Sequence, residues 1–209
     1  MTNPYTDLKS RYSGLIFDCD GTLTDSMPLH YRAWTATLDR HGIRFPESRF
    51  YEMGGVPTTK IVKALAVEQG VDVNVNEVSK EKEEEFMGMI VEVQPNDPVC
   101  EIARRYHGLM PLAVASGGIR DVIINQLLLI SVIDLFDTLV GAEDTQRHKP
   151  EPDVFLEAAK RIGIEPARCL VFEDTDIGIE AACRAGMDYV DVRNLPAGPQ
   201  PCRLTDRSS

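Results

Sequence analysis

Three short apolar runs constrain the fold of this chain more than any other feature: GLIF (14–17), PLAVAS (111–116) and CLVF (169–172). Each run is too short for a typical helix and is largely apolar, as is expected of a strand buried on both faces of a sheet. Residues 137–141 and 188–192 are weaker candidates of the same kind. The sequence therefore predicts a parallel sheet with both faces covered.

Helical patterns separate the later runs, at residues 119–130, 153–163 and 177–186. The last two end at a glycine, the residue that most often terminates a helix. Strands that alternate with helices of this length predict an α/β fold with right-handed crossovers. We therefore expect a doubly wound parallel sheet of the Rossmann type.

Residues 27–92 depart from this pattern, because they contain helical sequence and no convincing strand. We expect them to form a small all-helical domain inserted after the first strand. Residues 1–26 and 93–209 would then form the core domain. The segments 24–28 and 91–97 are the predicted hinges between the two.

The composition limits the kinds of partner. A formal net charge of -11 argues against general binding to nucleic acid or to an anionic membrane surface. No apolar run approaches the roughly 18 residues of a membrane span, and the N-terminus lacks an apolar signal-peptide core. The five scattered cysteines favour reduced thiols. We expect a cytoplasmic protein, a monomer, that acts on a small molecule.

The first apolar run ends at Asp18 and Asp20. In an extended chain, residues two apart project to the same side, so the two carboxylates would lie together. Carboxylates that close repel each other unless one is protonated or a cation lies between them. Mg²⁺ prefers such hard oxygen ligands. The alternative is an Asp-Gly turn that closes a hairpin.

The other strand ends supply complementary groups. Ser116 precedes Gly117 and Gly118 at a predicted helix start, where backbone N–H groups can bind an anion, although Ser is also a common helix cap. Lys149 lies in the proline-rich loop HKPEPD, and a solvated lysine is the alternative there.

Glu173 and Asp174 end the third run, where an acidic helix N-terminus is the alternative explanation. Ligands of open α/β sheets bind outside the carboxyl ends of the strands, which predicts that all these side chains converge. Such a set can hold a metal ion and a phosphoryl group together.

Four segments, DCDGT, VASGG, HKPEPD and FEDTDIGIEAACRAGM, resemble in order and spacing the four motifs of the haloacid dehalogenase (HAD) superfamily of phosphotransferases. The resemblance covers nearly the whole chain. The helical insert is similar to the small cap of the beta-phosphoglucomutase-like branch. Within that branch, LIFDCDGTLTDSMPLHYRAW and MDYVDVR look similar to bacterial fructose-1-phosphate phosphatases.

The resemblance implies a role for each acid. Asp18 would be the nucleophile that takes the phosphoryl group as an aspartyl phosphate. Asp20 would act as general acid and then as general base, for which a raised pKa is expected. Mg²⁺ would be held by Asp18, the backbone carbonyl of Asp20, Asp174 and Glu173.

The resemblance also implies that Ser116, Gly117 and Lys149 bind the transferring phosphoryl oxygens. In the cap, His30 matches a histidine thought to couple closure to the general acid, and a surface histidine is the alternative. Lys60 would be the cap cation that faces the sugar.

These expectations together predict a Mg²⁺-dependent phosphohydrolase of a small phosphorylated metabolite such as fructose 1-phosphate. A beta-phosphoglucomutase is the alternative, but it needs a second cationic phosphate site on the cap. Thr58 stands where that branch presents an arginine, and Lys60 would replace it only in part. A catalytically silent sugar-phosphate sensor is a third possibility, although such a protein is expected to lack the nucleophile Asp18.

Overall fold

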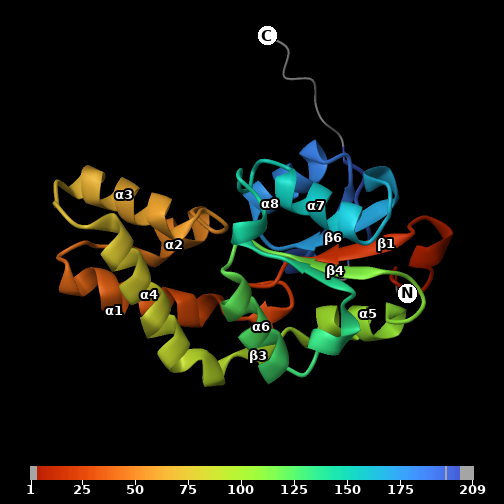
Figure 1. The fold of residues 1–209 in the computed structure, drawn as a ribbon, viewed down its shortest axis with the longest axis horizontal. Coiled ribbons are helices and arrows are strands. Elements are labelled where there is room, and N and C mark those ends of the chain that lie inside the picture. The colour runs from red at the N-terminus through yellow and green to blue at the C-terminus, as the bar shows by residue number, and fades with distance from the viewer. Residues whose placement is uncertain (1–3, 196, 203–209) are drawn as a thin grey trace, which may run out of the picture.

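The computed structural model describes residues 4–195 and 197–202 and contains a five-stranded sheet in the order β5-β4-β1-β6-β7 (Figure 1). All neighbouring strands in this sheet are parallel. The predicted α/β fold with a parallel sheet is confirmed, and all five expected strands are present. Their bounds are β1 Gly14–Phe17, β4 Leu112–Ala115, β5 Thr138–Val140, β6 Cys169–Glu173 and β7 Asp188–Asp191.

The first strand, β1, lies at the centre of the sheet between β4 and β6. Phe17 is in register with Val114 of β4 and with Phe172 of β6, so these three strands end at the same edge. The strand order reverses beside β1, and a crevice forms at such a point in doubly wound sheets. The residues that follow these strands are therefore brought to one place.

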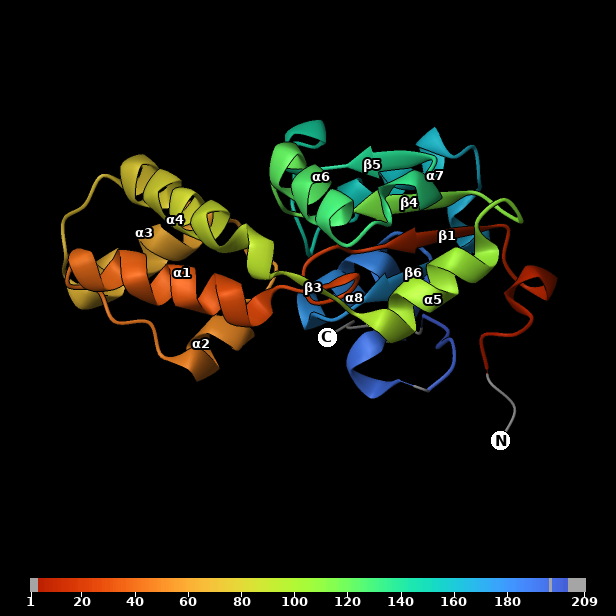
Figure 2. The same cartoon turned by 90° about the horizontal axis from the view of Figure 1, so that it is seen from below.

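Helices cover both faces of the sheet (Figure 2). Alternate strand residues such as Leu15 and Phe17 pack with residues of α5 and α6, whereas Ile16 and Val171 pack with α7 and α8. The helix α5 has no counterpart among the helices expected from the sequence. The bounds are α5 Asp97–Tyr106, α6 Arg120–Leu129, α7 Asp153–Arg161 and α8 Asp176–Arg184.

Short 3-10 helices complete the described connections. They lie at Leu8–Ser10, Ile90–Glu92, Ile133–Leu135, Ala142–Asp144, Pro166–Arg168 and Val192–Asn194. None of the helices in residues 4–195 and 197–202 is long and apolar enough to cross a membrane.

Four α-helices and no strand lie within residues 27–92, all of which the structure describes: α1 Met27–Arg40, α2 Glu47–Glu52, α3 Thr58–Gln69 and α4 Val75–Met89. They stand beside the sheet as a separate bundle (Figures 1 and 2). The bundle has its own apolar cluster, in which Trp34, Leu38 and Leu65 are buried. The exact boundaries of the core and cap domains stay a prediction.

The two connections between bundle and sheet form an antiparallel pair that the sequence pattern does not reveal. Strand β2 (Thr24–Asp25) pairs with β3 (Gln94–Pro95), in the segments predicted as hinges. Strands of two residues carry too little periodicity to be recognised in a sequence.

Candidate active site

The turn after β1 packs against Asp174, the residue that follows β6. Gly21 has a φ of +79°, and a Cβ atom there would lie 2.2 Å from Oδ2 of Asp174. The hydroxyl of Thr22 donates to Oδ1 of Asp174 at 3.1 Å. Because the chain continues into β2, which pairs with β3 and not with β1, the hairpin alternative is wrong.

Asp18, Glu173 and Asp174 form a buried acidic cluster whose carboxylate oxygens lie within 4.8 Å of one another. Burial raises the pKa of Asp18 well above its ordinary value; Lys149 opposes this shift, and the charges of Glu173 and Asp174 add to it. Burial and the charge of Glu173 raise the pKa of Asp174 to about 7. The cluster therefore holds more negative charge than its surroundings stabilise.

Lys149 is the internal counterion of this cluster. Its Nζ atom lies 2.7 Å from Oδ1 of Asp18 and 2.6 Å from Oε2 of Glu173, and the residue is 6% exposed. Burial would lower the pKa of the ammonium group, but the two carboxylates hold it above its usual range. The solvated-lysine alternative is thus wrong for Lys149.

One buried ammonium group faces three carboxylates here, which leaves room for a further positive charge. Glu173 already has partners for both oxygens, because its Oε1 accepts from the backbone N–H and the hydroxyl of Thr175. Asp18 and Asp174 keep oxygens for another ligand. The donor set consists of hard carboxylate oxygens and fits a divalent cation such as Mg²⁺.

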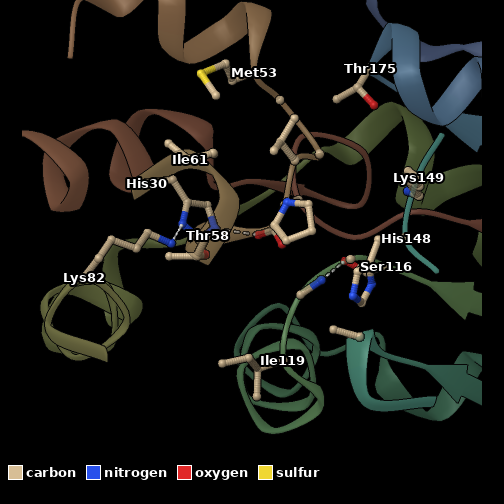
Figure 3. Close-up of a pocket in the computed structure, with 18 of the residues that line it drawn as sticks. His30, Met53, Thr58, Ile61, Lys82, Ser116, Ile119, His148, Lys149 and Thr175 are labelled. Carbon is tan, nitrogen blue, oxygen red and sulfur yellow. Dashed lines mark hydrogen bonds and ion pairs between the residues drawn. The ribbon is translucent and has the colours of Figure 1, made fainter. Parts of the chain in front are cut away.

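Ser116 is 2% exposed at the end of β4, and its Oγ accepts from the N–H of Gly118 at 3.1 Å. It lines the same pocket as Asp18, Gly117 and Lys149. Figure 3 shows Ser116 and Lys149 on the core side of this pocket. The structure therefore brings the residues predicted to bind phosphate next to the predicted nucleophile.

Asp20 lies on the other side of the turn, outside the acidic cluster. Its Oδ1 accepts from Ser26 Oγ at 2.7 Å, from His30 Nε2 at 2.9 Å and from Gln126 Nε2 at 2.9 Å. Burial favours the neutral acid, but these three partners outweigh it and lower the pKa of Asp20 below its ordinary value. The expectation of a raised pKa is wrong for this structure.

Ser26 and Gln126 are site residues that sequence reasoning misses. Gln126 is fully buried on α6, on the same buried face as Val122, Ile123 and Leu127. A polar side chain on the buried face of a helix needs a partner, which is the signal that would have singled it out.

His30 connects the helical bundle to Asp20. Its Nδ1 lies 3.0 Å from Nζ of Lys82, and its ring stacks on Phe86 with centroids 3.8 Å apart. Since an ammonium group only donates, Nδ1 is the acceptor and Nε2 carries the proton given to Asp20. Burial and Lys82 lower the pKa of His30. The surface-histidine alternative is wrong.

Lys82, and not Lys60, is the cap lysine closest to the reacting groups. Lys60 is exposed and is not among the residues lining the pocket, although its neighbours Thr58 and Ile61 are. At 100° per residue, Lys60 lies about 200° around α3 from Thr58, on the outer face. Lys82 belongs to the highly charged run KEKEEE (80–85), yet it is only 3% exposed.

The pocket lies between bundle and sheet and has a volume of about 480 Å³. The loop that carries Gly54 and Gly55 approaches the core closely: a Cβ on Gly55 would lie 3.0 Å from Cδ1 of Ile177. Figure 3 shows cap residues on one side of the pocket and core residues on the other. The bundle therefore closes over the strand ends.

Comparison with known proteins decides the family. The sequence model described as haloacid dehalogenase-like hydrolase matches residues 15–192. The chain belongs to this family. The Escherichia coli (strain K12) protein "Fructose-1-phosphate phosphatase YqaB" is 37% identical over 185 residues, which cover 88% of this chain and 98% of that protein. The predicted enzyme class, a phosphatase of the HAD family, is confirmed.

The branch of the HAD family is also confirmed. The "Beta-phosphoglucomutase" of Bacillus subtilis (strain 168) is 27% identical over 85% of this chain and 82% of that protein. A crystal structure of beta-phosphoglucomutase from Clostridium difficile has a TM-score of 0.76 and 23% identity, over 85% of this chain and 83% of that one. The latter shows a shared fold.

Proposed function

We propose that this HAD enzyme is a Mg²⁺-dependent phosphohydrolase of a sugar phosphate, with fructose 1-phosphate as the specific candidate. The main support is one observation: Asp18, Ser116 and Lys149 line a single pocket beside a buried acidic cluster. The substrate class rests on the 37% identical relative, whose whole length is nearly covered.

Asp18 is the nucleophile in this proposal. Its carboxylate attacks phosphorus, the bond to the sugar oxygen breaks, and an aspartyl phosphate forms, which divides one difficult displacement into two. Asp20 gives a proton to the leaving sugar oxygen and later takes one from the attacking water. The bonds from Ser26, His30 and Gln126 favour the carboxylate that the second step needs. The negative charge of a bound phosphate raises the pKa of Asp20 for the first step.

Asp18, the backbone carbonyl of Asp20 and Asp174 would hold Mg²⁺. The bound ion supplies positive charge that reduces the repulsion between a carboxylate nucleophile and an anionic phosphoryl group. Glu173 acts through its contacts, because it fixes Lys149 and, through Thr175, the start of α8.

Ser116, Gly117 and Lys149 bind the phosphoryl oxygens and compensate charge as it moves in the transition state. Residues 27–92 act as a cap domain that keeps water from the aspartyl phosphate until the sugar has left. The closely packed loop at Gly54 and Gly55 supports this role.

Hydrolysis is favoured over isomerisation by Thr58. A mutase must bind a bisphosphate and needs a cation on the cap at this position, but here the hydroxyl of Thr58 donates to Glu83 at 2.8 Å. Incubation of beta-glucose 1-phosphate with a trace of the bisphosphate tests this. Conversion to the 6-phosphate faster than phosphate release would establish the mutase alternative.

The proposed function is tested by phosphate release from a panel of sugar monophosphates, with Mg²⁺ and with a chelator, beside Asp18→Asn. We expect release that requires Mg²⁺ and is abolished by the substitution. A wild-type protein that binds sugar phosphates but releases no phosphate would support the sensor alternative. Undiminished activity of Asp18→Asn would show that the nucleophile is misassigned.

A further inference from the structure

The cap side of the pocket has an unusual charge pattern for a site that takes a phosphate ester. Several of the cap residues that line it are apolar, among them Met27, Trp34, Phe50, Met53 and Ile61. Among the described cap residues that line the pocket, Glu83 is the one with a carboxylate, and its side chain is 20% exposed. A negative charge on this wall is unexpected, because it would repel an anionic substrate.

Glu83 is held in place by two donors. Its Oε1 accepts from Oγ1 of Thr58 at 2.8 Å and from Nζ of Lys82 at 3.2 Å, and its Oε2 lies 3.3 Å from the same Nζ. A carboxylate offers about four acceptor positions. Within the described part of the chain these contacts use three, so Oε2 keeps an acceptor position for a hydroxyl donor in the pocket.

The ammonium group of Lys82 already has partners within the cap. It donates to His30 and to Glu83, and it lies 5.4 Å from the ring centroid of Trp34 and 5.6 Å from that of Phe86. The side chain is 4% exposed, so it has no freedom to turn toward a second phosphate.

Lys80 is the other cap lysine that lines the pocket, but its side chain is 78% exposed and pairs with Glu84 at 3.4 Å. Lys82 and Glu83 cancel in charge. A second phosphate bound at this wall would lie near the Glu83 carboxylate without a free buried cation between them, and like charges repel each other.

We infer that Glu83 determines specificity: it accepts a hydrogen bond from a hydroxyl of the leaving group and rejects substrates with a second phosphate at their far end. This inference rests on the proposed function and narrows its substrate class to monophosphates of neutral polyhydroxylated compounds. Glu83 does not touch the reacting atoms in this scheme. It determines which phosphate esters bind in a reactive position.

The test measures kcat/KM for fructose 1-phosphate and for fructose 1,6-bisphosphate with Mg²⁺. The wild-type enzyme prefers the monophosphate. Glu83→Gln lowers this preference by at least about tenfold, because it weakens a charge-assisted hydrogen bond and removes the repulsion. The matched control is Glu77→Gln, which removes one charge from an exposed position of the same helix and leaves the preference unchanged.

Hydrolysis of p-nitrophenyl phosphate separates this inference from the proposed function. A wild-type protein that hydrolysed neither p-nitrophenyl phosphate nor any sugar monophosphate would reject the proposed function itself. An active wild-type enzyme whose preference is the same in Glu83→Gln would overturn the inference alone.

Glu83→Asp decides the matter if Glu83→Gln also loses activity on p-nitrophenyl phosphate. This variant keeps the negative charge, but its side chain is one methylene shorter, so the carboxylate lies farther from the pocket. We expect weaker use of the monophosphate and continued rejection of the bisphosphate. A variant that accepted the bisphosphate despite its charge would contradict the electrostatic part of the inference.

Discussion

Nε2 of His30, in the first helix of the inserted bundle, lies 2.9 Å from Oδ1 of Asp20, in the turn after the first strand of the sheet. On its other side His30 accepts from Lys82 of α4. The hydrogen-bond chain from Lys82 through His30 to Asp20 thus joins two helices of the bundle to the proposed general acid. Its geometry depends on how the bundle sits on the core.

Replacing His30 by alanine removes one of the three donors to Asp20. We expect kcat/KM for a sugar monophosphate to fall by about ten- to a hundredfold, part of what general acid–base catalysis contributes. The fall is smaller for p-nitrophenyl phosphate, whose phenolate leaves without a proton. His41→Ala is the control, because His41 pairs with Glu81 and does not line the pocket. Equal losses on both substrates would contradict a role through Asp20.

The sheet and its site could be predicted because their signals are local. Each strand that carries chemistry is a run of fully buried residues ending directly in a functional group, as Phe17 leads into Asp18 and Ala115 into Ser116. Parallel strands must bring such ends together, so position along the chain was sufficient to bring Ser116 and Glu173 to the same edge as Asp18.

The cap side could not be predicted in the same way. Lys82 stands in a highly charged run, and its burial depends on the packing of α4 against α1, which no local pattern records. The pKa of Asp20 is likewise set by Ser26, His30 and Gln126, and Gln126 lies 106 residues from Asp20 in sequence. Sequence spacing indicates where a carboxylate lies, whereas its protonation depends on donors that only the tertiary structure supplies.

Lys149→Met is expected to destabilise the metal-free protein by about 3–5 kcal/mol, the usual result of removing one partner of a buried ion pair. Asp18 and Glu173 would lose the ammonium group that lies within 2.7 Å of both. Urea denaturation in a chelator measures the loss, and Mg²⁺ restores part of it. Lys160→Met is the control, because that side chain is 79% exposed. An unchanged free energy of unfolding in Lys149→Met would contradict the role of Lys149 as the counterion of Asp18 and Glu173.

The stability of the metal-free protein should depend on the protonation of Asp174, whose pKa rises from 3.8 to about 7 on folding. The folded state holds this proton more tightly, so its stabilising effect is present below about pH 4 and is lost as the pH rises to about 7. The pKa of Asp18 is shifted in the same direction, and the lowered pKa of His30 acts in the opposite direction.

Comparison with Asp174→Asn isolates this contribution. In a chelator, the free energy of unfolding of the wild type relative to the variant falls by about 2 kcal/mol between pH 5 and pH 7. Saturating Mg²⁺ reverses the trend, because the ion binds the deprotonated carboxylate. The same difference between the two proteins at both pH values, with and without Mg²⁺, would refute the predicted metal site.

The contact between cap loop and core predicts a selective effect of substituting Gly55. Gly55 has a φ of +80°, and a Cβ atom there would meet the side chains of Ile177 and Thr175. Gly70 has a φ of +68° at the end of α3, but a Cβ atom there has nothing within 4 Å. Both alanine variants carry the left-handed backbone penalty of about 1–2 kcal/mol. Only Gly55→Ala also pushes the cap away from the core.

We therefore expect similar losses of thermal stability in Gly55→Ala and Gly70→Ala but different kinetics. Gly55→Ala should lower kcat/KM for the sugar monophosphate by about tenfold or more, since a small misplacement at a closing lid is costly to catalysis. Gly70→Ala should keep the wild-type value. If both variants retain full kcat/KM, the approach of Gly55 to Ile177 has no part in catalysis, and the role of the bundle as a water-excluding lid loses its structural support.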